Sequence, residues 1–118
     1  MPLTITTREA NGVTILDLSG KIVLGEESAS LRERIKQLLA DNKKKVLLNL
    51  ENVGFIDSAG VGTLVAAYTT IKANEGELKL VNLTKKFRET LQITRLLTVF
   101  EVYDTEAHAL DSFKQAPR

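Results

Sequence analysis

The sequence predicts an α/β fold: a mixed, mainly parallel sheet that is opened by an antiparallel hairpin and accompanied by about four helices. Two observations carry this prediction. Asn11-Gly12, a strong signal for a tight hairpin turn, separates two strand-like stretches at the start of the chain. After this hairpin, short apolar runs alternate with stretches of helical periodicity, as in chains whose parallel strands are joined by helices. The expected order of elements is β-β-α-β-α-β-α-β-α.

The opening strands are followed by the first helical stretch. Residues 3 to about 8 alternate as a half-buried strand does, and residues 13 to 18 form the second strand. A helix is expected from about residue 26 to 40, and Ser30 and Glu33 have the spacing of a capping box. The apolar face of this helix is formed by Leu31, Ile35, Leu38 and Leu39.

Three more strands and three more helices complete the predicted fold. The unalternating apolar run from residue 46 to 50 is typical of a strand covered on both faces, and residues 78 to 81 and 99 to 103 are the remaining strands. One helix is expected from about residue 58 to 76. Thr84 is expected to cap the next, and Asp104 or Thr105 the last, with residues 116 to 118 frayed. The inward side chains are expected to be Val61, Leu64, Val65, Tyr68 and Ile71, then Phe87, Leu91 and Ile93, then Ala109, Leu110 and Phe113.

The composition is that of a globular protein, and we expect one domain over residues 1–118 with 43% hydrophobic and 26% charged residues. A net charge of +1 does not favour nucleic acid or an anionic membrane as a partner. Because cysteine is absent, disulfides, thiol catalysis and thiolate metal sites are excluded. No apolar run approaches the ~20 residues that span a bilayer, and the amino terminus has no signal-like core. We therefore expect a cytoplasmic protein.

The segment from Phe55 to Gly62 stands out because it places two glycines in the first turns of a helix. Each glycine there costs roughly 1 kcal/mol relative to alanine, and a sequence that accepts this cost often needs a close backbone approach. Asp57 and Ser58 lie where the helix has unpaired N–H groups, so either residue can cap it. The simplest interpretation makes this pair only a cap, Phe55 a core residue and Gly62 an allowance for tight packing.

The same helix has a second face made of small, uncharged side chains. Ala59, Gly62, Ala66 and Thr70 line it, and no charged residue occurs between Asp57 and Lys72. A helix face that meets solvent usually carries charges. Two interpretations remain open from the residues alone: another protein docks on this face, or another helix of the same domain covers it.

The string Ile56-Asp57-Ser58-Ala59-Gly60-Val61-Gly62 resembles the signature of anti-sigma factor antagonists, the small single-domain members of the STAS family. The resemblance covers nearly the whole chain. It includes the hairpin that ends in Gly20, the apolar strand before the string, and the segment from Leu91 to Phe100.

The resemblance implies a regulatory protein that is not an enzyme and needs no cofactor, metal or catalytic residue. In such proteins the serine of the string, here Ser58, is phosphorylated by an anti-sigma factor that is also a serine kinase, and a phosphatase reverses this. The unphosphorylated form binds the anti-sigma factor and so releases a sigma factor. We expect a monomer or weak dimer with no direct contact to nucleic acid. The expected partner-binding residues are Asp57, Ser58, Ala59, Gly60, Gly62, Ala66, Glu26 and Glu27.

One departure from the family pattern lies after the second strand. Family members often have an acidic residue shortly after the closing glycine, and it contributes to the partner surface. Here Val23 occupies that place, and the segment from Gly20 to Glu27 looks one residue longer than usual. Glu26 or Glu27 is the candidate substitute.

Other classes of function fit the sequence less well. A phosphoacceptor-aspartate receiver needs an acidic cluster for Mg²⁺, and Asp17 has no acidic neighbour in sequence. Ser58 lacks a nucleophile elbow, and the single histidine, His108, is expected at the surface of the last helix. Gly60 to Thr63 lacks the lysine of a phosphate-binding loop. The main alternative is a STAS-type regulatory module of a transporter, a lipid-transport system or a signalling complex.

Overall fold

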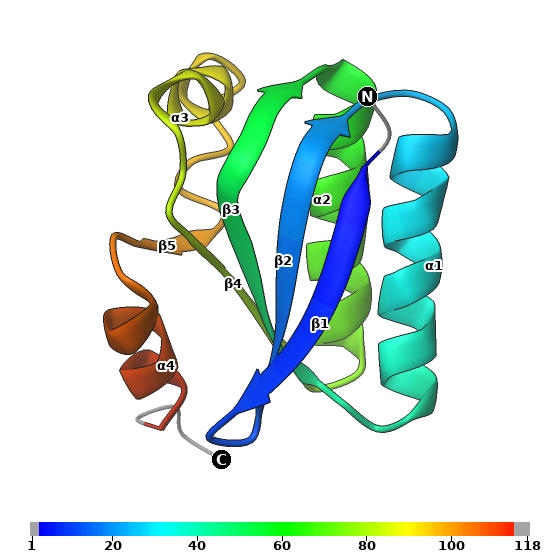
Figure 1. Cartoon of the computed structure of the whole chain (residues 1–118), viewed down its shortest axis with the longest axis vertical. Helices are drawn as coiled ribbons and strands as arrows, with labels where there is room; N and C mark the ends of the chain where they lie inside the picture. Colours follow the sequence, from blue (N-terminus) through cyan, green and yellow to red (C-terminus); the bar gives the residue numbers. More distant parts are fainter. Residues whose placement is uncertain (1–2, 115–118) are drawn as a thin grey trace.

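The computed structural model describes residues 3–114 of the chain (Figure 1). The predicted fraying of residues 116 to 118 lies outside the described residues. Five strands form one sheet in the order β1-β2-β3-β4-β5, in which β1 is antiparallel to β2 and every other pair is parallel. This confirms the predicted α/β fold with its opening hairpin. The elements are β1 (Thr4–Ala10), β2 (Val13–Ile22), α1 (Glu26–Ala40), β3 (Lys45–Ile56), α2 (Ser58–Ala73), β4 (Glu77–Val81), α3 (Lys85–Ile93), β5 (Glu101–Tyr103) and α4 (Glu106–Lys114).

The hairpin forms at Asn11-Gly12, as the sequence predicts. Both residues have positive φ, 55° and 81°, and Ala10 pairs with Val13 across the turn. A two-residue turn of this kind suits the twist of the flanking strands and requires residues that tolerate the left-handed region. β2 then continues past the predicted end at residue 18 as far as Ile22.

Helices cover the two faces of the sheet unequally. α1 and α2 lie side by side on one face, and α4 covers only the lower part of the other (Figure 1). The main core lies between the sheet and α1, α2 and α3, whereas a smaller cluster lies under α4. The smaller cluster consists of Val13, Ile15, Leu47, Val81, Ala109, Leu110 and Phe113, which confirms the inward face predicted for the last helix.

β3 is longer than its neighbour β4, and this difference creates room for α3. Of the residues of β3, only 45–49 pair with β4. The pairs that β3 makes beyond Asn49 are with β2 alone. α3 lies beside that upper part and places Phe87 and Leu91 in the main core. Thr84 caps α3 by accepting a hydrogen bond from the backbone N–H of Phe87 (3.1 Å), as predicted. Ile93, which was expected to face inward, is 81% exposed because it lies about 200° around the helix from Leu91, on the side of α3 that faces away from the core.

α1 starts where the sequence predicts, but the cap at its start differs from the prediction. The helix begins at Glu26 after the N-cap residue Gly25, and no side chain caps it, so the capping box of Ser30 and Glu33 is wrong. Ser28 instead donates its hydroxyl hydrogen bond to the carbonyl of Val23 (2.7 Å). At α4 the capping residue is Thr105, whose side chain accepts from the backbone N–H of His108 (3.1 Å).

A polar network ties the hairpin to the carboxyl-terminal helix. The Arg8 guanidinium donates to both Asp17 oxygens (2.5 and 2.9 Å) and to the Glu106 carboxylate (2.8 Å). Asn49 donates a further hydrogen bond to Asp17 (2.8 Å), and Asn82 donates to Asn49 (3.1 Å). The network therefore crosses β1, β2, β3 and the end of β4, on the face that α4 partly covers.

Removing the charge of Asp17 should reduce stability at neutral pH. Hydrogen bonds from Arg8, with a smaller contribution from Asn49, lower the pKa of Asp17 against the opposing effect of partial burial. A lowered folded-state pKa means stabilisation that is present above the unfolded pKa and is lost as pH falls through the folded value. Because Asp17 is only half-buried and its partner Arg8 is exposed, solvent screens the pair, and Asp17→Asn should cost only about 1 kcal/mol of unfolding free energy at pH 7.

Urea unfolding of both proteins at pH 7 and at about pH 3 checks this expectation, since the two free energies should converge at the acidic pH. Glu33→Gln on the exposed face of α1 is the control and should show no such convergence. An equal difference at both pH values would show that Asp17 acts through packing and not through charge.

Candidate functional site

The candidate site lies where β2 and β3 end together at the start of α2. Lys21 pairs with Phe55 and Ile22 with Ile56, so the two chains leave the sheet side by side. β2 then passes into the loop before α1, and β3 passes through Asp57 directly into α2 (Figure 1). This is the carboxyl end of parallel strands, where α/β sheets place their functional loops.

The carboxylate of Asp57 connects these two exits. One oxygen accepts a hydrogen bond from the backbone N–H of Gly60 (2.8 Å), which caps α2. The other accepts from the backbone N–H of Leu24 (3.1 Å) in the loop before α1. These backbone donors, Gly60 first and Leu24 second, lower the pKa of Asp57. Asp57 is therefore charged near neutral pH and serves as a structural link between the loop and the helix.

Gly60 is required by a close approach between α2 and β2. A Cβ atom at this position would lie 2.0 Å from the carbonyl oxygen of Ile22 and 2.8 Å from the Ile56 side chain. No side chain fits there, which confirms the close approach predicted from the glycine cost at this residue. Gly60 is buried, so it shapes the site from below the surface.

Gly62 does not share this role. A Cβ atom at Gly62 would meet nothing within 4 Å, so the close approach expected from its sequence context is absent, and tight packing does not explain it. Gly62, Ala66 and Thr70 are exposed and Ala59 is half-buried. Within the described part of the chain, no helix covers this face of α2, which excludes the interpretation that the domain itself occupies it.

Ser58 is the first residue of α2 and is exposed. Thr63, five residues farther along α2, is buried, and the Thr63 hydroxyl donates a hydrogen bond to the carbonyl of Ala59 (3.0 Å). Of these two hydroxyl groups only that of Ser58 is open to solvent. The structure thus places an accessible hydroxyl at the amino end of a helix, where unpaired N–H groups favour a negative charge.

Glu26 and Glu27 occupy the first turn of α1, with Glu26 exposed and Glu27 half-buried. They follow the loop that Asp57 anchors through Leu24, but no hydrogen bond or ion pair among the described residues joins either one to Asp57 or Ser58. Val23 is half-buried, and its carbonyl accepts from both the N–H (3.2 Å) and the hydroxyl of Ser28. Val23 therefore organises the start of α1 through its backbone.

Two exposed apolar side chains near the site were missed from the sequence. Leu24 is 77% exposed in the loop after β2, and Phe55 is 42% exposed near the end of β3, with the Lys86 ammonium 5.9 Å from its ring centre. The sequence did contain a signal for Phe55. Phe55 and Ile56 are consecutive residues of a strand, and successive side chains of a strand point to opposite faces. Because Ile56 is buried in the core, Phe55 faces the other way. An aromatic ring and an isobutyl group at this end favour contact with another protein.

Enzymes often use a bound metal ion or a histidine side chain for catalysis. Among the residues that the structure describes, no group of three or more His, Cys, Asp or Glu side chains is placed to hold a metal ion. His108 is exposed on α4, which lies at the other end of the sheet from the start of α2 (Figure 1). Of the helices formed within residues 3–114, none combines the length and the apolar character that crossing a membrane requires.

Comparison with known sequences links the site to one family. The sequence model of the STAS domain matches residues 4–109. The anti-sigma F factor antagonist of Paenibacillus polymyxa is 27% identical over 111 residues, which cover 93% of this chain and 94% of that protein. The anti-sigma-B factor antagonist of Staphylococcus aureus is 28% identical over 72 residues, which cover 61% of this chain and 67% of that protein.

Solved structures show the same fold. A protein of Thermotoga maritima matches with a TM-score of 0.85 and 24% identity over 92% of each chain. The anti-sigma factor antagonist SpoIIAA in its unphosphorylated form matches with a TM-score of 0.73 and 20% identity, over 96% of this chain and the whole of SpoIIAA. The phosphorylated form of SpoIIAA matches with a TM-score of 0.72 and 20% identity, over 93% of this chain and 99% of SpoIIAA.

The family match begins with β1 and extends into α4, so it includes the sheet, the loop before α1 and the whole of α2. It therefore contains every residue of the candidate site. The structural matches independently reproduce the mixed five-stranded sheet and the helices around it. The chain belongs to the STAS domain family.

Proposed function

We propose that this chain is an anti-sigma factor antagonist whose binding to its anti-sigma factor is switched off by phosphorylation of Ser58. The observation that carries the proposal is the exposed Ser58 hydroxyl on the first turn of α2, next to a helix face without charge. Relatives named as anti-sigma factor antagonists support it, as does SpoIIAA, a fold neighbour solved in both an unphosphorylated and a phosphorylated form.

In this proposal the chain is a substrate and not an enzyme. The anti-sigma factor supplies the kinase site, and ATP supplies the phosphoryl group. The Ser58 oxygen attacks the γ-phosphorus, ADP leaves, and the hydroxyl proton passes to a base of the kinase. A phosphatase later hydrolyses the phosphoserine and regenerates the free hydroxyl. The chain contributes a rigid presentation of Ser58, because Asp57 and Gly60 hold the start of α2 against β2.

The switch itself follows from charge. A phosphoserine carries about −1.5 to −2 charges at neutral pH. At a helix start the free N–H groups favour it by roughly 0.3–1 kcal/mol, while the neighbouring Asp57 carboxylate opposes it, so the domain should keep its fold. A partner that covers Ser58 must remove water from the phosphate, which costs several kcal/mol unless a cation compensates.

Incubation with the purified anti-sigma factor kinase and ATP should add one phosphate, and peptide mapping should assign it to Ser58. Ser58→Ala should remain unmodified under the same conditions, and it serves as the matched control. The kinase is first obtained by a pull-down from the native cell with Ser58→Ala and Ser58→Asp in parallel. Phosphate on Thr63, or retention of a transporter component in place of a kinase, would contradict the proposal.

Phosphorylation should weaken binding to the anti-sigma factor by about a hundredfold or more, since each ~1.4 kcal/mol is a tenfold change in affinity. Ser58→Asp carries a single charge and should weaken binding less, whereas Ser58→Ala should bind as the unmodified chain does. Isothermal titration of the four forms gives the affinities, and amide NMR spectra show whether the changes stay near α2. Tighter binding by the phosphorylated form would rule out this mechanism.

Gly60 and Gly62 offer a matched pair that separates folding from binding. Gly60→Ala should destabilise the domain by about 1–3 kcal/mol, because the added methyl group overlaps the Ile22 carbonyl. Gly62→Leu should leave stability unchanged or raise it by up to ~1 kcal/mol, because the position is open and leucine favours a helix. Its side chain should nevertheless weaken partner binding.

Thermal unfolding and partner affinity of both variants check this pair of expectations. A large loss of stability in Gly62→Leu would show that this face is covered within the folded protein. Unchanged affinity in the same variant would place the partner elsewhere on the surface.

A further inference from the structure

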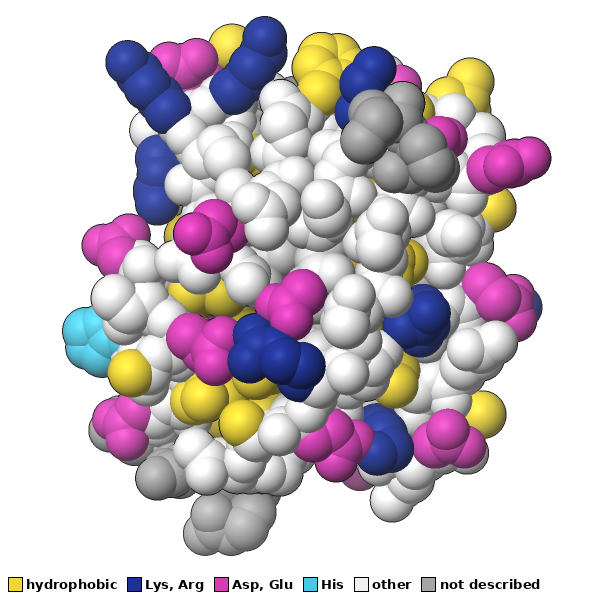
Figure 2. All heavy atoms as spheres, in the orientation of Figure 1, with side chains coloured by type: hydrophobic (Ala, Val, Ile, Leu, Met, Phe, Trp, Pro, Cys, Tyr) yellow, Lys and Arg dark blue, Asp and Glu magenta, His cyan; other side chains and the backbone are white. Residues whose placement is uncertain are grey.

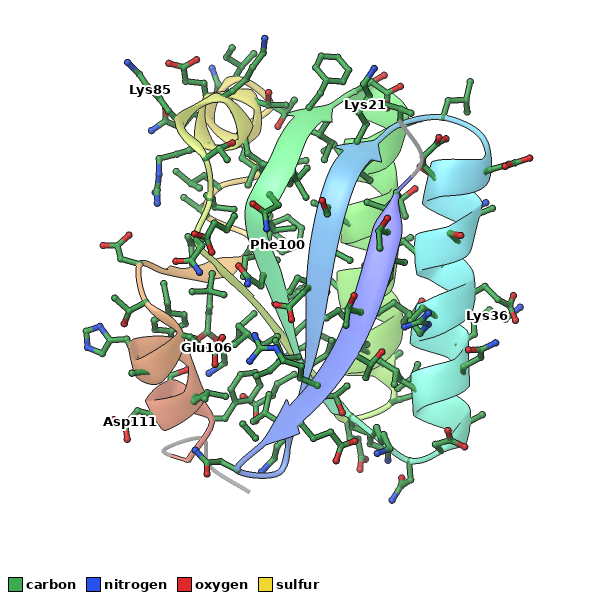
Figure 3. The ribbon with its side chains drawn as sticks, in the orientation of Figure 1. Lys21, Lys36, Lys85, Phe100, Glu106 and Asp111 are labelled. Atoms are coloured by element: carbon green, nitrogen blue, oxygen red, sulfur yellow. The ribbon has the colours of Figure 1, made fainter. Side chains whose placement is uncertain are left out.

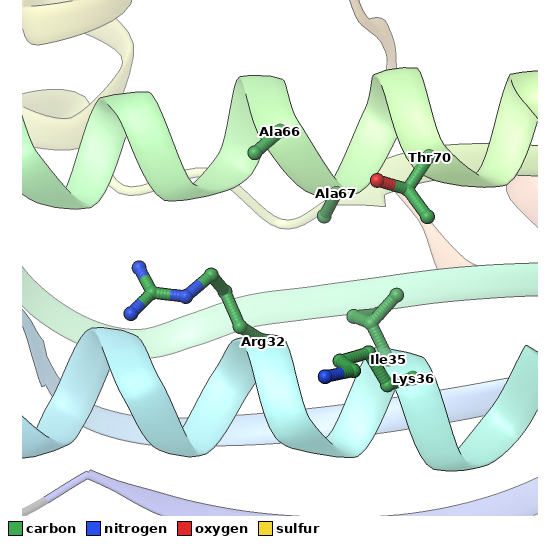
Figure 4. A pocket seen from close by; sticks show the side chains of 6 residues that line it. All are labelled: Arg32, Ile35, Lys36, Ala66, Ala67 and Thr70. Carbon is green, nitrogen blue, oxygen red and sulfur yellow. The ribbon is translucent and has the colours of Figure 1, made fainter.

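A groove between α1 and α2 lies farther along the helix that begins with Ser58. Ile35 and Ala67 are buried and form its floor, while Ala66 and Thr70 line the α2 side. Arg32 and Lys36 line the α1 side, and Figure 4 shows these six side chains facing one another across the groove. The lining is almost entirely apolar apart from the charged ends of the Arg32 and Lys36 side chains.

The volume of the groove limits what can occupy it. The groove is open to solvent on one side, and its volume is about 100 Å³. Pockets for drug-sized ligands measure roughly 300–1,000 Å³, so a cofactor or a lipid chain does not fit. A single aliphatic side chain is of suitable size. Such a side chain would restore the dispersion contacts that the small residues Ala66 and Ala67 leave unmade along this part of α2.

Arg32 and Lys36 indicate the charge of the occupant. They are exposed and lie one turn apart on α1, where like charges repel. Within residues 3–114 neither side chain takes part in a hydrogen bond or an ion pair. Two unpaired cations beside an apolar groove complement a segment that presents a carboxylate next to an aliphatic side chain.

A second copy of this chain does not meet that description. A symmetric pair uses the same patch on both subunits, so it would bring two Arg32 and two Lys36 side chains together. The α2 face also lacks any carboxylate between Asp57 and Lys72 that could neutralise them. The occupant must therefore come from a different protein.

We propose that the groove between α1 and α2 is a second anchoring point for the anti-sigma factor, filled by an aliphatic side chain from an acidic segment of that partner. This inference rests on the proposed function. Ala66 and Thr70 lie eight and twelve residues after Ser58, about 12 and 18 Å along the helix at 1.5 Å per residue. The groove is thus too far from Ser58 to take part in phosphoryl transfer, and it contributes to docking alone.

The test uses the full chain and the purified anti-sigma factor kinase. Arg32→Glu/Lys36→Glu reverses the charges, and Thr70→Phe fills the groove from an exposed position. The matched control is Lys44→Glu/Lys72→Glu, which makes the same change in net charge away from the groove lining. Circular dichroism and thermal unfolding confirm that each variant folds before its affinity and its phosphorylation kinetics are measured.

We expect both groove variants to raise the Kd for the kinase and the KM for Ser58 phosphorylation by about tenfold or more, with kcat unchanged. The control should change neither by more than about threefold. Equal losses in the charge-reversal variant and its control would reduce the effect to general electrostatic attraction and overturn the inference. So would unchanged affinity in both groove variants, or a dimer of the unmodified chain that Thr70→Phe dissociates.

If the proposed function itself were wrong, the same experiment would give a different result. In that case the unmodified chain itself would neither bind the kinase nor become phosphorylated. An unmodified chain that binds normally, together with groove variants that also bind normally, refutes only the groove.

Discussion

The hydrogen bonds of the Asp57 carboxylate are the contacts on which the geometry of the site depends. One oxygen holds the N–H of Gly60 at the start of α2, and the other holds the N–H of Leu24 in the loop before α1. Because both donors are backbone groups, they join two chain segments and not two flexible side chains. The link directs the exposed Ser58 outward, and it connects the beginning of α1 to the beginning of α2.

This link is possible only because α2 approaches β2 very closely. The absence of a side chain at Gly60 lets the helix lie against the Ile22 carbonyl, and the N–H of Asp57 then donates to the same carbonyl (3.3 Å). The site is therefore built from backbone positions that leave little freedom for movement. A rigid helix start fits the proposed presentation of Ser58 to a kinase, because less entropy would be lost when such a partner binds.

The two faces of the molecule differ in the side chains that they present to solvent. On one face, α1 and α2 cover the main core and present small side chains and a narrow groove toward solvent. Figure 2 shows the opposite face, where charged side chains are scattered over the surface and apolar atoms are visible in its lower part and along its upper edge. Figure 3 shows Glu106 there on α4, whose carboxylate the Arg8 side chain contacts from β1. The Arg8 network thus lies on that face, and the exposed small side chains of α2 lie on the other.

Much of the fold followed from the local sequence. Asn11-Gly12 determined the hairpin because few residues tolerate positive φ, and the alternation of apolar runs with helical periodicity determined the order of the elements. Thr84 was identified as a cap from its own chemistry. The cost of glycine in a helix is a local property, and it indicated the candidate site around Ser58. The resemblance of the string to a known signature indicated the family, which the match over residues 4–109 confirms.

Only the tertiary structure distinguished Gly60 from Gly62, because the carbonyl that excludes a side chain at Gly60 belongs to Ile22, far away in the sequence. The same holds for the second hydrogen bond of Asp57, whose donor Leu24 is 33 residues away. Ile93 was misplaced because it lies two residues after Leu91, about 200° around the helix, and therefore on the face of α3 opposite the buried one. The sequence by itself determined the type and order of the elements and which surface is chemically unusual, but not every boundary: β3 runs to Ile56 where the apolar run predicted residue 50, and α2 ends at Ala73 where residue 76 was expected. Which side chains face solvent, and what holds the loop to the helix, depended on contacts between segments distant in the chain, and local patterns contain no information about such contacts.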